Sequence, residues 1–193
     1  MRIPSIKGTA FQSAVEDLQR LVSEGKLSRD ELEAQLDEEE IGLLDAKVNA
    51  ASWYPMELYA RMIRLLAQKE ARGRKEEYLI RRGARAAERI RSAGIYRQLE
   101  LRRETWGERV GQIVVTISGV MYNFTRWHIE ATDGIRDFRV VVEDAAEFPD
   151  EALYTAQGFV EFVCCLVAGS RMRVTSSRPT PDRVVYEVRD VGR

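Results

Sequence analysis

The chain has 193 residues, of which 45% are hydrophobic and 32% are charged, and its formal net charge is −1. This balance is typical of a globular protein and excludes a disordered chain. No apolar run reaches the roughly 20 residues of a membrane span, and the N-terminus lacks the apolar segment of a secretory signal. We therefore expect a cytoplasmic protein with no membrane partner.

The first half of the chain predicts helices. Phe11, Val15 and Leu18 recur at the spacing of one helical face. Residues 28–31, Ser-Arg-Asp-Glu, have the pattern of a capping box at the start of another helix. After the Trp-Tyr-Pro junction at 53–55, further helices are expected over about 56–72, 74–92 and 95–104.

The second half changes to a period of two residues, which indicates strands. Alternating apolar residues predict a strand over 113–117 and a hairpin over 172–188, and a wide apolar face predicts a buried helix over 150–168. The sequence thus predicts one α+β domain spanning residues 1–193. Its N-terminal helices, over 1–104, would pack on an antiparallel sheet of about five strands over 105–193, with the buried helix between strand pairs.

The Asp-Gly dipeptide at 133–134 is typical of a hairpin with a two-residue turn. In that register Ile129 would lie opposite Phe138, and His128 would lie opposite Arg139 on the other face. Because side chains alternate across a strand, the apolar residues of this hairpin would share one face of the sheet.

Charge is unevenly distributed along the chain. Residues 61–103 hold 14 basic and 5 acidic side chains, whereas residues 1–60 hold 6 and 12. Several arginines fall on one flank of the helix predicted over 74–92, and they are candidates for binding an anion or an acidic partner. The alternative is a solvated face, or pairing with the acidic helices of the same chain or of a second copy. The candidates are Arg74, Arg81, Arg82, Arg85 and Arg89.

Aromatic residues and the single histidine are the candidates for a ligand-binding site. Aromatic side chains line small-molecule pockets, although they more often pack in a core or an interface. His128, on the polar face of a predicted strand, is a candidate for sensing pH or binding an anion, or for a plain cross-strand contact. The ligand-binding candidates are Trp53, Tyr54, Tyr78, Trp106 and His128.

No motif in the chain predicts catalysis or a metal site. Glycine-rich phosphate loops, a nucleophile elbow and a paired-histidine zinc helix are all absent. The adjacent Cys164 and Cys165 have no further ligands nearby, and we expect reduced, buried thiols. The sequence therefore assigns no catalytic residue, no metal ligand and no cofactor.

Two segments resemble a known superfamily. Residues 148–162, FPDEALYTAQGFVEF, followed by a strand, a proline-rich turn and RVVYEV at 183–188, are similar to the C-terminal part of the heme–nitric-oxide-binding and four-vinyl-reductase-like superfamily. The chain looks most like an uncharacterised paralogous family from myxobacteria, which shares the Trp-Tyr-Pro junction. The resemblance covers about residues 50–190. It implies helices on an antiparallel sheet, space for a small ligand between them, and a sensor or adaptor that often dimerises.

Two departures from the superfamily argue against its ligands. The heme-binding branch uses a helix-borne histidine and a Tyr-x-Ser-x-Arg motif, and this chain has neither. The reductase-like branch places cysteines around its last hairpin, where this chain has Ser176, Ser177 and Arg178. The sequence therefore predicts that heme is not bound.

These observations together predict a non-enzymatic regulatory or sensory scaffold domain that binds a small apolar or anionic ligand and forms a homodimer. An acidic protein is the expected partner of the arginines. One alternative is a nucleic-acid-associated regulator that uses the same arginines, which the slight negative net charge does not favour. Another is an enzyme whose site no motif reveals.

Overall fold

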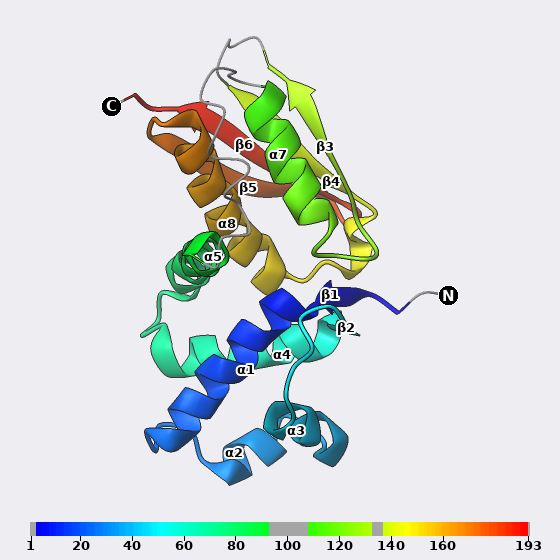
Figure 1. Ribbon diagram of the computed structural model, residues 1–193, viewed down its shortest axis with the longest axis vertical. Coiled ribbons are helices and arrows are strands. Elements are labelled where there is room, and N and C mark those ends of the chain that lie inside the picture. Colours follow the sequence, from blue (N-terminus) through cyan, green and yellow to red (C-terminus); the bar gives the residue numbers. More distant parts are fainter. Residues whose placement is uncertain (1–2, 93–107, 133–136, 193) are drawn as a thin grey trace. The chain divides into compact units, whose positions relative to one another are not determined.

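The computed structural model describes residues 3–92, 108–132 and 137–192, and Figure 1 shows the order of the elements along the chain. It confirms the predicted α+β class. The described residues form two compact units: unit 1 contains residues up to Tyr78 together with Met121–Asn123, and unit 2 contains Leu79–Val120 and the residues from Phe124 onward. The single domain remains a prediction.

Unit 1 is mainly helical. Its core lies between the apolar faces of two helices, where Phe11, Leu18, Met62, Ile63 and Leu66 are fully buried. The predicted capping box of Ser28 and Glu31 is confirmed, and Asp37 and Glu40 form a second one. The elements are β1 (Ser5–Lys7), α1 (Gly8–Ser23), α2 (Arg29–Glu33), α3 (Glu38–Asp45), β2 (Trp53–Pro55) and α4 (Met56–Glu70).

The short strands β1 and β2 form an antiparallel pair that the sequence pattern does not predict, since three residues are too few to show a period. Ile6 lies opposite Tyr54, and Lys7 lies opposite Trp53. The Ser5 amide donates a hydrogen bond of 2.8 Å to Oδ1 of Asn123. This strand pair therefore ties the start of the chain to the segment 121–123.

Unit 2 is a four-stranded antiparallel sheet covered by helices on one face. The strands follow the order β3-β4-β6-β5, and both α7 and α8 contact the sheet and each other (Figure 1). α5 (Lys75–Ser92) belongs to this unit from Leu79 onward. The other elements are α7 (Glu108–Gly119), β3 (Arg126–Ala131), β4 (Phe138–Glu143), a 3-10 turn (Ala145–Glu147), α8 (Asp150–Ala168), β5 (Met172–Thr180) and β6 (Arg183–Asp190).

Aromatic packing fills the space between the sheet and α8. The ring of Trp127 stacks on that of Tyr186 at 5.8 Å and meets the Phe148 ring edge-on at 6.1 Å. Tyr186 is fully buried, and its hydroxyl donates a hydrogen bond to the Leu153 carbonyl at 3.1 Å. A buried phenol needs such a partner, so this bond fixes α8 on the sheet.

α8 is long and apolar enough to cross a membrane, but 56% of its apolar stretch is buried inside the protein. The burial comes from β5, β6 and α7, which α8 contacts. The helix therefore has the character of a core helix, as the sequence predicts for 150–168.

The strand expected over 113–117 is wrong, because these residues belong to α7. Gly111, Val114, Ile117 and Ser118 are the buried positions of this helix, and their spacing of three or four residues is helical. The β-branched residues at 113–117 suggested a strand, but packing against β3 and β4 decides the conformation. The large sheet consequently has four strands in the described residues instead of about five.

The sequence correctly predicts which residues of the β3–β4 pair share the apolar face of the sheet. The predicted pairing register of the two strands is wrong by two residues. Ile129 lies opposite Val140 instead of Phe138, and His128 lies opposite Val141 instead of Arg139. A shift of two residues keeps every side chain on its own face, so the apolar pattern cannot detect it. The dipeptide at 133–134, which set the predicted register, lies outside the described residues.

Candidate functional site

An open groove of about 760 Å³ runs along α1 in unit 1. α1 forms one wall, and the segment that follows α3 forms the other. Polar and apolar side chains line it in similar proportion, which offers a ligand both hydrogen-bonding groups and apolar contact. The lining residues are Gln12, Val15, Glu16, Gln19 and the stretch 45–50.

Hydrogen bonds hold the two walls of this groove in place. The Gln19 side-chain amide donates to the Leu44 carbonyl at 2.6 Å, which ties α1 to the end of α3. Gly8 lies so close to the second wall that a Cβ there would be 2.1 Å from the Asn49 carbonyl oxygen. Only glycine permits this approach of two backbones.

Tyr54, a predicted ligand-binding residue, contacts both walls of the groove without being one of its lining residues. Its ring stacks on Phe11 of α1 at 4.3 Å, and its hydroxyl accepts a hydrogen bond of 2.9 Å from the Asn49 amide. Trp53 points the other way on the same strand, is 43% exposed, and carries the Lys7 ammonium 4.4 Å from its ring centre. The structure therefore does not bring these two neighbours into one pocket.

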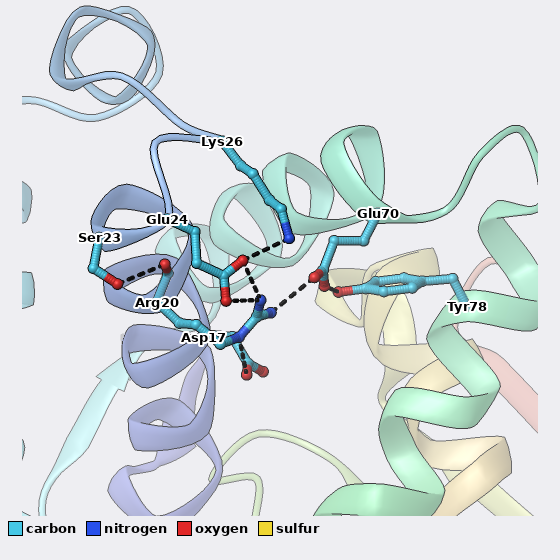
Figure 2. A network of polar contacts seen from close by, with 7 residues as sticks. All are labelled: Asp17, Arg20, Ser23, Glu24, Lys26, Glu70 and Tyr78. Carbon is cyan, nitrogen blue, oxygen red and sulfur yellow. Dashed lines mark hydrogen bonds and ion pairs between the residues drawn. The ribbon is translucent and has the colours of Figure 1, made fainter.

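Tyr78, another predicted ligand-binding residue, lies in a polar network of unit 1. Figure 2 shows its hydroxyl bound to Glu70 at 2.9 Å, and the same carboxylate accepts from Arg20 at 2.8 Å. Arg20 also reaches Glu24 at 3.3 Å, and Glu24 accepts from Lys26 at 2.6 Å. The hydrogen bond to Glu70 raises the pKa of Arg20. This network links α1 with α4 and the first turn of α5.

The predicted arginine flank is interrupted in the structure. Arg81, Arg85 and Arg89 of α5 are exposed, but Arg82 is only 5% exposed. Arg74 precedes the helix, is exposed, and lies 3.5 Å from Glu77. The exposed part of the flank is therefore Arg81, Arg85 and Arg89, which we call the arginine face of α5.

His128 lies on the face of the sheet opposite the one on which α7 and α8 pack. Its Nε2 atom is 3.6 Å from Oε1 of Glu130, which also accepts from Arg183 at 2.6 Å. Arg183 lies 3.4 Å from Glu143 as well. These ion pairs extend across Val141, which is fully buried although it points to this outer face.

The remaining residues singled out in the sequence are Trp106 and the two cysteines. Trp106 lies outside the described residues. Cys164 is buried and Cys165 is half-buried, and burial raises the pKa of both thiols, so they are protonated at neutral pH and poor nucleophiles. Within the described ranges, no group of three or more histidine, cysteine or acidic side chains is placed to hold a metal ion.

Comparison with solved structures identifies the fold. An H-NOX protein mutant from K. algicida matches with a TM-score of 0.65 at 9% identity, over 96% of this chain and 96% of its own. The chain adopts the H-NOX fold. An H-NOX protein from S. oneidensis in the Fe(II)NO ligation state matches with a TM-score of 0.61 at 12% identity, over 96% of this chain and 99% of its own. No protein-family model matches the sequence, and no curated protein does.

The H-NOX likeness confirms the fold that the resemblance implies and corrects the prediction about heme, whereas membership of the myxobacterial family stays a prediction. The solved neighbours are described by the state of an Fe(II) centre, and one by the redox potential of its heme. A departure in two motifs was therefore too weak a ground for excluding this ligand. Those motifs describe only one way of holding the iron.

The residues of this chain do not fit a heme whose iron is held by histidine in the protein interior. The chain has a single histidine, and His128 faces outward on the sheet with 45% of its side chain exposed. Tyrosine, cysteine and methionine are the other side chains that ligate heme iron. An interior heme would need an axial ligand from these classes instead of His128.

Proposed function

We propose that this chain is a sensor domain that binds a small ligand and passes the binding event on through association with another protein. The H-NOX fold, matched over nearly the whole length of both chains, carries this proposal. A sensor works when its ligand has different affinities for two states of the domain. The groove on α1 and the arginine face of α5 provide two surfaces on which such states can differ.

Heme is the first ligand to test. Bound heme would supply an iron atom that can take a diatomic gas as a further ligand. The chain itself would contribute the enclosing residues and an axial ligand other than His128. The lone histidine therefore provides a control: a variant at this position should leave binding unchanged.

Titration of the purified chain with hemin, followed by visible absorption, tests this ligand. The proposal predicts saturable binding of one hemin per chain, with equal affinity in the wild type and in His128→Ala. Hemin that fails to saturate would contradict heme as the ligand. Loss of binding in His128→Ala alone would contradict the placement of His128 away from the ligand.

The arginine face of α5 supports an acidic partner as the second part of the proposal. Arg81, Arg85 and Arg89 are exposed along one side of the helix, and guanidinium groups bind carboxylates and phosphates with paired hydrogen bonds.

Binding of a polyglutamate peptide and of a DNA duplex, measured at low and high salt, distinguishes an acidic protein partner from a nucleic acid. We expect polyglutamate to bind more tightly and the double variant R81E/R85E to abolish its binding. Tighter, steeply salt-dependent binding of DNA would favour the nucleic-acid regulator instead.

A further inference from the structure

Side chains of a helix cover one edge of the four-stranded sheet, whereas the described residues leave the other edge without such a cover. This difference points to an interface. An edge strand exposes unpaired amide and carbonyl groups that can pair with another chain. Proteins usually cover or blunt such edges. Here β5 forms one edge and β3 forms the other.

Side chains of α8 cover the edge formed by β5. Gln157 donates to the Val174 carbonyl at 2.9 Å, and Glu161 accepts from the Val174 amide at 2.9 Å. Glu161 lies one helical turn before Cys165, and Gln157 lies two turns before it. The Cys165 sulfur accepts a hydrogen bond of 3.3 Å from the Met172 amide. Farther along the strand, Pro179 removes an amide altogether. This edge is closed to a further strand.

The β3 edge has no such cover in the described part of the chain. His128, Ile129 and Glu130 have backbone hydrogen bonds only through their pairing with β4. α7 packs on the covered face of the sheet, where Gly111 lies against the Ile129 side chain. β3 has six residues without proline, long enough to form a strand pair.

The sequence of β3 is complementary to itself in an antiparallel pair. When His128 lies opposite its own copy, Arg126 lies opposite Glu130 of the partner subunit at both ends of the pair. On the other face, Trp127 lies opposite Ile129 of the partner subunit. Opposite charges and an aromatic beside a β-branched residue are both favourable cross-strand pairs. Arg126 is 75% exposed and pairs with Asp144 of its own chain at 2.7 Å, and Glu130 is 36% exposed and accepts from Arg183 at 2.6 Å. Pairing across the two-fold axis would therefore extend these ion pairs or replace them.

We propose that β3 pairs with β3 of a second copy and joins the two sheets into one across a two-fold axis. The proposal commits to a homodimer and to one register, centred on His128. It does not depend on heme or on the arginine face of α5. An acidic partner or a ligand would then act on a dimer.

A charge exchange tests the interface. Light scattering after gel filtration, over a range of concentrations, should give the mass of a dimer for the full chain. Arg126→Glu or Glu130→Arg alone places like charges opposite each other and should weaken dimerisation about tenfold. The double variant R126E/E130R restores opposite charges and should dimerise within about threefold of the wild type. Arg173→Glu on the other edge strand is the control, and it should leave the dimer unchanged.

A cysteine at the two-fold axis tests the register. Directly opposite residues in an antiparallel pair have Cα atoms about 4.5–5.5 Å apart, a separation that a disulfide can bridge. His128→Cys should therefore form a linked dimer under oxidation, whereas Ala131→Cys and the wild type should not.

A monomer at every concentration, or a dimer that resists both single charge reversals, would overturn the interface. Linkage through Ala131→Cys would overturn the register. Circular dichroism checks that each variant is folded.

Discussion

Gly83 on α5 and Gly158 on α8 each lie against the backbone of the other helix. A Cβ on Gly83 would be 1.8 Å from the Thr155 carbonyl oxygen, and a Cβ on Gly158 would be 1.8 Å from the Ile80 carbonyl oxygen. No side chain separates the helices at this crossing. The two glycines therefore set the distance between α5 and the helix that covers the sheet.

Replacing either glycine by alanine should destabilise the protein. The added methyl group meets backbone atoms, which cannot rotate away, so the helices must separate, at a cost of about 3 kcal/mol. Gly42→Ala in α3 is the matched control, since nothing lies within 4 Å of a Cβ there, and alanine should stabilise that helix by about 0.5–1 kcal/mol. Urea unfolding measures both effects. Equal stabilities of the three variants would contradict the close crossing.

Arg178 should be needed for the corner between the sheet and α8. Its guanidinium donates to the carbonyls of Ala145 and Pro181, each at 3.0 Å, and to that of Phe148. Because Arg178→Ala leaves these carbonyls without their charged donor, we expect a loss of about 2 kcal/mol in urea unfolding. Arg173→Ala, exposed on the same strand, should change the free energy of unfolding by less than about 0.5 kcal/mol. A similar loss in both variants would show that Arg178 has no special role.

Glu161 should protect the edge formed by β5. Glu161→Ala removes the acceptor of the Val174 amide, which should cost about 1–2 kcal/mol and expose an edge that promotes aggregation. Glu161→Gln keeps an acceptor oxygen and serves as the control. Light scattering during storage measures the aggregation, and urea unfolding measures the loss of stability. Aggregation of Glu161→Gln at the rate of Glu161→Ala would contradict the role of this hydrogen bond.

Stability should fall in acid through surface carboxylates. The hydrogen bond from Lys69 lowers the pKa of Glu31 below its ordinary value of 4.5, and the Thr180 hydroxyl lowers the pKa of Asp182. In a window just below pH 4.5 the unfolded chain binds more protons than the native one, so stability is lost as the pH falls. The urea midpoint should decrease below about pH 4.5, and less steeply in Glu31→Gln. A midpoint that rises on acidification would contradict this.

The sequence predicted the elements whose signals are local. Ser28 and Glu31 form their capping box because four consecutive residues contain the whole interaction. α8 follows from its wide apolar face, and the left-handed Gly169 ends it as expected. The conformation of residues 113–117 was not predictable in this way, because contacts with β3 and β4, distant in sequence, override the alternating pattern.

The candidate site was less predictable than the fold. Ligand binding by Tyr54 stays a prediction; in the structure its ring stacks on Phe11 and its hydroxyl accepts from the Asn49 amide, beside the groove. The groove lies between α1 and residues 45–50. No local sequence pattern predicts that these two segments lie side by side. Gly8 is the one signal at hand, since glycine at the start of a helix marks a close backbone approach.

Native mass spectrometry tests the central claim most directly, because the claim is that this H-NOX fold holds a small ligand. The full chain, produced in cells supplied with hemin and again without it, should carry a non-covalent adduct of constant mass that is lost on denaturation. A native mass equal to that of the bare chain in both preparations would contradict the sensor function.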